Sequence, residues 1–160
     1  MAGTLTWIPA LDRPDLLAPP VAAALAARPD DAASVQVAEI DPSLADTAAF
    51  CEAYAVPLDI SANCVVLAAK RSGSTQLAAC MVLATTRADV NGLARRTLEA
   101  RKASFASMDE AVAATGMDYG GITPIGLPPE RGSSAHGSFT CHPTTCLPAL
   151  AIALASHWMR

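Results

Sequence analysis

The sequence lacks the segments that direct a chain to or through a membrane. A membrane-spanning helix needs about 18 consecutive apolar residues, and the closest segment, LPALAIALA, is roughly half that length. The opening MAGTLTWIPALDRPD has no basic start followed by a long apolar run, so it does not resemble a secretory signal. We therefore expect a soluble, cytoplasmic protein.

Standard catalytic signatures are also absent. The chain has no G-x-S-x-G, H-E-x-x-H or G-x-x-x-x-G-K-S/T motif, which removes the common hydrolase, protease and nucleotide-binding patterns. A C-x-x-C pair, typical of structural zinc sites, is missing too. The nearest set of metal-ligating side chains is His136, Cys141, His142, Cys146 and His157. We interpret this set as part of an irregular tail, so neither a metal nor another cofactor is expected.

The five cysteines are interpreted as reduced thiols. Their number is odd, and three of them lie in apolar runs, where a small thiol packs well. A cysteine nucleophile would need a nearby base and an exposed, electropositive setting. Cys64 and Cys80 lie in strand-like apolar segments, so core packing is the favoured interpretation for both.

What the chain does have is ample apolar material and an uneven charge. Its 160 residues suit one domain, and 52% of them are hydrophobic. The formal net charge of -4 argues against a surface that coats nucleic acid generally. Residues 1–69 hold two basic and nine acidic side chains, whereas 70–160 hold nine basic and six acidic. One short window contains Arg87, Arg95, Arg96, Arg101 and Lys102. This basic window is consistent with binding of a local anionic partner, although a solvent-exposed helix face is the favoured interpretation.

The first half of the chain is predicted to contain two helices, a strand and part of a hairpin. An alanine-rich helix is expected over 12–28, delayed or interrupted by Pro19-Pro20, and SVQVAEI alternates as a strand would. Helical spacing over 44–54 predicts a helix capped by Ser43. NCVVLAAK and QLAACMVLATT, joined by RSGST, predict a hairpin of central strands covered on both faces.

The next segment is predicted to form a helix, a short strand and a capped helix. The first helix would follow Asp89 and run over 90–100, and KASF would be the strand. In SMDEAVAATG, Ser107 and Glu110 have capping-box spacing, and Gly116 supplies the helix stop. This order points to an α+β fold with a mixed sheet. After Pro128 the chain becomes polar and aperiodic, so we place a boundary between 1–128 and an atypical tail at 129–160.

The stretch TGMDYGGITPIGLP, Thr115 to Pro128, combines four glycines and two prolines in fourteen residues. Its core GGITPIG can present consecutive main-chain N–H and C=O groups to a ligand, although such loops are more often plain turns. The stretch resembles the T-G-x-x-x-G-G-x-x-P-x-G segment of the YbaK/EbsC family, the fold inserted in bacterial prolyl-tRNA synthetases. RKASFASMDEAVAATG and CEAYAVPLDISANCVVLAAK resemble the family's flanking elements, so the resemblance covers roughly residues 40 to 128.

The resemblance implies a fold, an activity and partners. The fold would be a mixed, strongly curved, barrel-like sheet surrounded by helices around a pocket. The activity would be that of a trans-acting aminoacyl-tRNA deacylase, which hydrolyses the ester of a mischarged tRNA, with tRNA(Pro) as the candidate. The implied partners are the tRNA acceptor end and, as further candidates, prolyl-tRNA synthetase and a second copy in a homodimer.

The resemblance also implies site residues. The catalytic positions would be Asn63, Gly121 and Thr123. The substrate-binding positions would be Gly120, Ile122, Pro124, Gly126, Arg101 and Lys102. Asn63 stands where the family usually carries a lysine, and a neutral amide donates hydrogen bonds but supplies no charge. Lys70 lies about 23 Å further along the strand and cannot take its place.

Three hypotheses follow. The first is an aminoacyl-tRNA deacylase. The second is a catalytically silent module that binds an aminoacyl group, a tRNA or a small ligand, motivated by Asn63 and by the tail. The tail does not continue the family's pattern, and a reading-frame change or a gene fusion would produce such a tail. The third is a truncated relic that folds with difficulty. The sequence favours them in that order.

Overall fold

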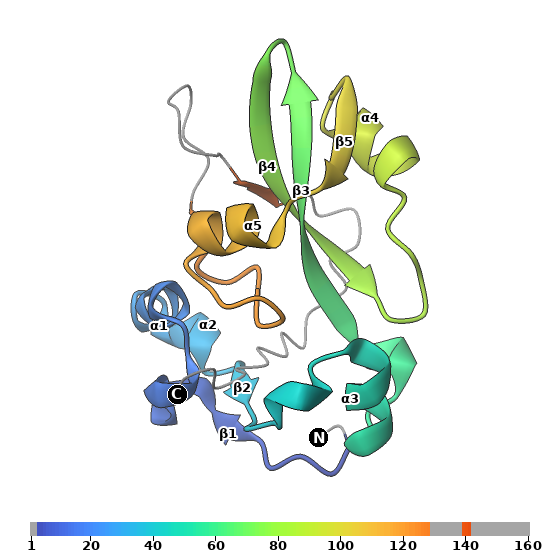
Figure 1. The fold of residues 1–160 in the computed structure, drawn as a ribbon. Helices are drawn as coiled ribbons and strands as arrows, with labels where there is room; N and C mark the ends of the chain where they lie inside the picture. Colours follow the sequence, from blue (N-terminus) through green and yellow to red (C-terminus); the bar gives the residue numbers. More distant parts are fainter. Residues whose placement is uncertain (1–2, 129–138, 142–160) are drawn as a thin grey trace.

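The long β-hairpin predicted from NCVVLAAK and QLAACMVLATT is the central feature of the fold. In the computed structural model, which describes residues 3–128 and the main chain of 139–141, β3 (Ala62–Arg71) pairs antiparallel with β4 (Ser74–Leu83). Ser72 and Gly73 connect the strands, and both have positive φ, 48° and 87°. This is the pattern of a type I′ turn, whose twist matches that of the strands. The predicted hairpin is confirmed (Figure 1).

The hairpin lies at the centre of an open, mixed sheet with the strand order β5-β3-β4-β6. β5 (Lys102–Phe105) runs antiparallel to β3, and β6 (Phe139–Cys141) runs parallel to β4. The predicted α+β class with a mixed sheet is therefore confirmed. The strands that the structure describes do not close on one another, so the barrel-like form expected from the resemblance is not confirmed.

Short helices and a two-stranded sheet surround this central sheet (Figure 1). The α-helices are α1 (Pro19–Ala26), α2 (Pro29–Ala32), α3 (Thr47–Ala53), α4 (Arg95–Thr97) and α5 (Met108–Thr115). Turns of 3-10 helix are formed by Ala10–Asp12, Pro14–Leu16, Pro42–Leu44 and Leu58–Ile60, and a π-helical turn by Val90–Ala94. The small sheet pairs β1 (Ile8–Pro9) with β2 (Gln36–Val37). In the part of the chain that the structure describes, no helix is long and apolar enough to cross a bilayer.

The middle of β3 is buried on both faces of the sheet, since its successive side chains point to opposite sides and each side packs in a core cluster. Val66 and Ala68 pack in a cluster with Ala111 of α5. Leu67, which is 1% exposed, packs on the other face with Val90 of the π-helical turn. The prediction of a strand covered on both sides is confirmed for this segment.

A second core lies between the N-terminal part of the chain and the loop that follows α5. Val21 of α1 packs in this core with Met117, although the two are far apart in sequence. Ile122 and Leu127 contact both this core and the cluster on the α5 face of the sheet. The loop therefore joins the two parts of the fold.

Two N-terminal elements are shorter than predicted. The helix expected over 12–28 begins only at Pro19, because proline suits the first helical position and breaks a helix that runs through it. The strand expected over SVQVAEI is reduced to Gln36–Val37, since β1 offers only two residues as its partner.

The cap of α3 was predicted at the wrong residue. Ser43 belongs to the preceding 3-10 turn, where the side chain of Asp41 accepts its N–H. Asp46 is the N-cap of α3, and its carboxylate accepts the N–H groups of Ala48 and Ala49 at 3.0 and 3.3 Å. The helix therefore begins three residues later than expected.

The two helices after the hairpin follow their predicted caps. Asp89 accepts main-chain N–H groups at the start of the 90–100 segment, which forms the π-helical turn and then α4 rather than one regular helix. Ser107 and Glu110 form the predicted capping box of α5, and the helix ends at Gly116 with φ of 67°. The boundary predicted at Pro129 and the tail 129–160 lie outside the described residues, apart from the main chain of β6, and stay predictions.

Candidate functional site

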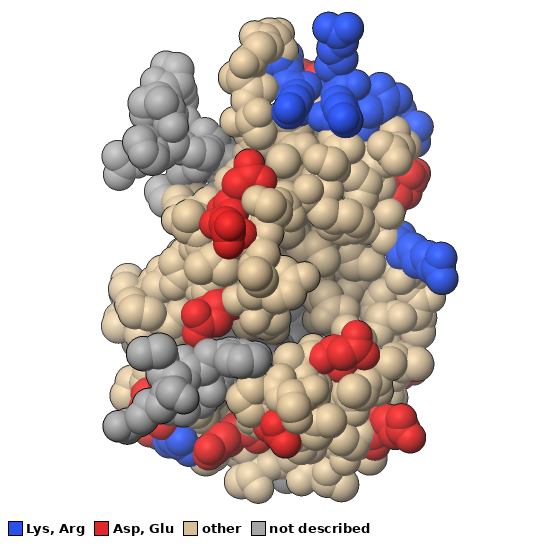
Figure 2. Space-filling view, viewed as in Figure 1, with Lys and Arg blue, Asp and Glu red and all other residues tan. Residues whose placement is uncertain are grey.

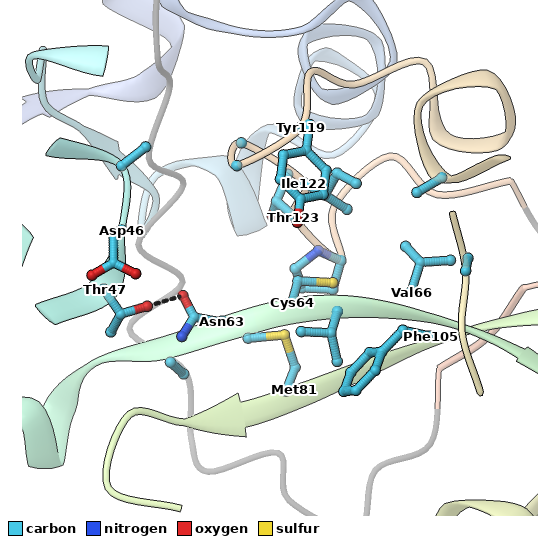
Figure 3. Close-up of a pocket in the computed structure, with 18 residues that line it drawn as sticks. Asp46, Thr47, Asn63, Cys64, Val66, Met81, Phe105, Tyr119, Ile122 and Thr123 are labelled. Carbon is cyan, nitrogen blue, oxygen red and sulfur yellow. Dashed lines mark hydrogen bonds between the residues drawn. The ribbon is translucent and has the colours of Figure 1, made fainter. Parts of the chain in front are cut away.

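A cavity of about 620 Å³ opens beside the first half of β3. Most of its lining comes from the segment that leads into α3 (Ala45–Thr47), the start of β3 (Ala62–Val66) and the loop Tyr119–Pro124, and Met81, Phe105, Ala106 and Ala111 complete it. Figure 3 shows the loop residues Tyr119, Ile122 and Thr123 across from β3. Three segments that are distant in sequence therefore meet at one site.

The loop is held in place by hydrogen bonds that begin at the end of α5. The hydroxyl of Thr115, which is buried, donates to the C=O of Ala111 at 2.8 Å and accepts the N–H of Met117 at 3.2 Å. The N–H of Thr123 then points back to the sulfur of Met117 at 3.4 Å, and the Thr123 hydroxyl accepts the N–H of Ile125 at 3.3 Å. These bonds make the loop a preformed wall rather than a flexible link.

Gly126 fixes the far end of the loop against α1. A Cβ at this position would lie 2.5 Å from the main-chain oxygen of Pro20, so only glycine allows the contact. Its φ of +78° is also in the left-handed region. Gly126, expected to bind substrate, does not line the cavity and instead anchors the loop that does.

The main-chain N–H groups of the loop differ in whether they form a hydrogen bond within the described residues. The N–H of Gly121 donates to the C=O of Asp118 at 3.0 Å, and that of Thr123 is used by the Met117 sulfur. The N–H groups of Gly120 and Ile122 form no hydrogen bond within the described residues. Both residues line the cavity, while the Gly121 N–H closes the turn.

Asn63, the expected catalytic residue on β3, faces α3 rather than a charged group. Its side-chain oxygen accepts a hydrogen bond of 3.1 Å from the hydroxyl of Thr47, the first residue of α3 (Figure 3). An amide whose oxygen is occupied in this way keeps its NH₂ group as a donor. Thr47 therefore orients Asn63 at the cavity wall.

The sequence interpretation missed Asp46 and Thr47. Both line the cavity, and Asp46 is the carboxylate among the side chains that do. The signal was present, since an aspartate directly before the run Thr47–Cys51 is a typical helix start, but Ser43 competed for the same role. Sequence spacing alone cannot show that this helix start lies opposite Asn63.

Cys51, Cys64 and Cys80 form no disulfide in the part of the chain that the structure describes, and the reduced state stays a prediction. Cys80 packs with Leu67, and burial raises the pKa of its thiol. A cysteine nucleophile is activated by a lowered pKa, so this shift disfavours such a role for Cys80. Cys64 was interpreted as a core residue, and the structure places it partly buried in the cavity wall.

No basic side chain lines the cavity in the part of the chain that the structure describes, and the two expected cationic contacts lie elsewhere. Arg101 and Lys102 are absent from the lining. Lys102 pairs with Lys70 across the strands, and the N–H of Arg101 donates to the C=O of Lys70 at 2.8 Å. Seven residues of β3 separate Lys70 from Asn63, a span of about 23 Å. The structure therefore does not bring these cations to the loop.

No group of three or more potential metal ligands occurs within the described residues. The set His136, Cys141, His142, Cys146 and His157 considered from the sequence lies outside them, apart from the main chain of Cys141.

Comparison with known proteins finds a family with this pattern. A family model for the aminoacyl-tRNA editing domain matches residues 41–136, more than half of the chain, including α3, β3 and the cavity loop. A solved structure described as the crystal structure of hypothetical protein APE2540 is 20% identical, with a TM-score of 0.44 and 51% of each chain covered. The match thus spans about half the length of that protein. No curated protein matches the chain significantly.

Proposed function

This chain belongs to the aminoacyl-tRNA editing domain family, and on that premise we propose that it is a deacylase that hydrolyses the ester of mischarged tRNA. A synthetase pocket separates small apolar side chains by only about 1–3 kcal/mol, so a second, hydrolytic site improves accuracy. The observation that carries the proposal is the cavity of about 620 Å³, in which Asn63 and the Gly120–Pro124 main chain lie together. Small-molecule sites occupy about 300–1,000 Å³.

The proposed reaction needs donors and a positioned water. Water attacks the ester carbonyl carbon, the bond to the ribose oxygen breaks, and that oxygen leaves with a proton. We assign the N–H groups of Gly120 and Ile122 and the NH₂ of Asn63 to the oxyanion that forms on the carbonyl. The neighbouring hydroxyl of the substrate's own ribose helps to hold the water. Esters are more reactive than amides, so this arrangement requires no nucleophilic triad.

The cavity wall supports a small amino acid as the group removed. Cys64, Met81 and Ile122 add apolar surface beside the donors. Such a wall favours a small, uncharged side chain, so we propose alanine or cysteine on tRNA(Pro) as the first substrates to test. Prolyl-tRNA synthetase, a homodimer and a cytoplasmic location stay predictions.

The catalytically silent binding module is the second candidate function. Two observations favour it: Asn63 is neutral where the family usually has lysine, and no Lys or Arg of residues 3–128 lines the cavity. A neutral wall still binds an aminoacyl group through hydrogen bonds. Binding without turnover distinguishes this candidate from the first.

The test measures release of amino acid from Ala-tRNA(Pro) and Cys-tRNA(Pro), with Pro-tRNA(Pro) as the correctly charged comparison. We expect release from at least one mischarged tRNA faster than in buffer alone. If both mischarged tRNAs release amino acid only at the rate found in buffer, but the protein binds tRNA, the silent binding module is supported instead. A broad, non-cooperative melt of the same preparation would instead favour the relic.

Variants of the Thr47–Asn63 pair test the residue assignment. Asn63→Ala removes an oxyanion donor and should lower the rate about 100-fold. Thr47→Val keeps the shape, removes the orienting hydrogen bond of 3.1 Å, and should lower the rate only about fivefold, equivalent to about 1 kcal/mol. Asn91→Ala is the matched control, since Asn91 is exposed and outside the cavity lining. Equal rates for Asn63→Ala and Asn91→Ala would remove Asn63 from the site.

A further inference from the structure

The basic side chains of this acidic chain are concentrated in one stretch. Seven of its eleven Lys and Arg lie within residues 70–102, which contain only two acidic residues, although the formal net charge of the chain is -4. Figure 2 shows blue side chains gathered over the end of the β3–β4 hairpin and β5, while most of the red ones lie over the rest of this face. The molecule is therefore electrically polarised along the hairpin.

Four exposed residues form the part of this surface that the strands place together, and we call it the basic end: Lys70, Arg71, Arg101 and Lys102. Lys70 and Lys102 are direct register partners, and like charges opposite one another destabilise a sheet. Arg71 is paired with Glu99 at 2.7 Å. The other three form no salt bridge within the described residues, and Glu110 is an acidic group near enough to interact with Lys70.

The basic end is separated from Asn63 by most of the length of β3. Asn63 and Lys70 are seven residues apart on β3, or about 23 Å. Among the described residues, the cavity wall carries one carboxylate, Asp46, and no cation. A ligand that carries both a small acyl group and many phosphates would therefore place the acyl group in the cavity and its phosphates at the basic end.

We propose that the basic end binds the backbone phosphates of the double-helical stem of an RNA whose 3′ end occupies the cavity. This inference rests on the proposed function and names the second contact of the same substrate. At about 3.4 Å per nucleotide along a strand, 23 Å corresponds to about seven nucleotides. That distance reaches past the short unpaired 3′ end of a tRNA into its paired stem. The contact is electrostatic and independent of base sequence.

The experiment compares two RNAs that carry no amino acid. One is a hairpin that ends in the unpaired 3′ overhang of tRNA(Pro), and the other is the overhang alone. Binding is followed by fluorescence anisotropy between 50 and 200 mM salt, with the unaltered chain, with the double variant Lys70→Gln/Lys102→Gln and with Arg28→Gln. Arg28 is paired with Asp31 at 2.6 Å in the α1–α2 region, so its replacement removes a cation remote from the basic end.

Each lost phosphate contact should reduce the slope of log affinity against log salt by about 0.9 for a duplex. The double variant should therefore lower the hairpin slope by about two, so that the affinity lost between 50 and 200 mM salt shrinks by about tenfold. Its binding to the overhang alone should not change, and Arg28→Gln should match the unaltered chain with both RNAs. Thermal unfolding checks that the double variant folds.

Two results overturn the inference: an unchanged hairpin slope in the double variant, or an equal reduction with the overhang alone. Neither depends on turnover, because the RNAs carry no ester. If no deacylation is found but the salt slopes change as expected, the proposed hydrolysis is wrong and the basic end remains a stem contact. If deacylation is found but the salt slopes are unchanged, the hydrolysis stands and the stem contact is wrong.

Discussion

Replacing Gly126 with alanine should displace the cavity loop from α1. A Cβ at this position would lie 2.5 Å from the Pro20 oxygen and 2.8 Å from the Val21 nitrogen. Both are main-chain atoms, which cannot turn aside as a flexible side chain does. The left-handed conformation costs a non-glycine residue about 1–2 kcal/mol, and overpacking adds typically about 1–3 kcal/mol. We expect the free energy of unfolding to fall by about 2–5 kcal/mol in total.

Gly73→Ala is the matched control for the conformational part of this loss. Gly73 has φ of +87°, yet a Cβ there would meet nothing within 4 Å. Its replacement should therefore cost only the conformational part, about 1–2 kcal/mol. Urea denaturation of the two variants and the unaltered chain gives the loss of unfolding free energy for each variant. An unchanged slope of unfolding free energy against urea concentration checks that each variant remains two-state.

The same substitution links the anchor to the proposed activity. Ile122 and the Gly120 main chain lie on the loop that Gly126 ends, so a shift of about 1 Å would misplace the donors and lower deacylation about 100-fold. Equal losses of unfolding free energy for Gly126→Ala and Gly73→Ala would refute the argument, because the close contact with α1 would then contribute nothing.

Two further predictions concern the helix caps. Hydrogen bonds from the main chain and hydroxyl of Ser107 hold the pKa of Glu110 below its ordinary value, and those from the Leu93 and Gly92 N–H groups do the same for Asp89. Because the folded pKa values are depressed, this stabilisation is complete above the unfolded-state values of about 4.3 and 3.9 and is lost as pH falls through the folded values. Urea unfolding from pH 6 downward should show the loss, and an equally steep loss in Glu110→Gln/Asp89→Asn would contradict it. Ser107→Ala removes the N-cap of α5 and should lower the unfolding free energy by about 1 kcal/mol. The control is Ser104→Ala at an exposed position of β5, and a loss for Ser107→Ala no larger than for this control would argue against the cap.

Local features of the fold could be predicted because their causes lie within a few residues. The hairpin follows from two apolar runs and a Gly/Ser turn, and the capping box of α5 from the spacing of Ser107 and Glu110. The family could also be recognised from the loop and its flanks. The start of α3 was misplaced because Ser43 and Asp46 are both good caps, and tertiary contacts decide between them.

The arrangement of the candidate site depends on contacts that sequence spacing does not encode. Thr47 and Asn63 are sixteen residues apart and meet through a side-chain hydrogen bond. Gly126 was expected at the substrate and instead packs on Pro20. Arg101 and Lys102 were expected beside the loop, but the antiparallel pairing of β5 with β3 carries them to Lys70, away from the cavity.

The sequence by itself determined the hairpin, the capped helix α5, the loop and the family, because backbone restrictions of glycine and proline, capping and alternation act over a few neighbouring residues. Only the tertiary structure decided that the loop is a wall held between two cores, that Thr47 orients Asn63, and that Lys70 and Lys102 meet at the far end of β3 from Asn63. The physical reason is that strand pairing and close packing join residues whose separation along the chain carries no information about their distance in space.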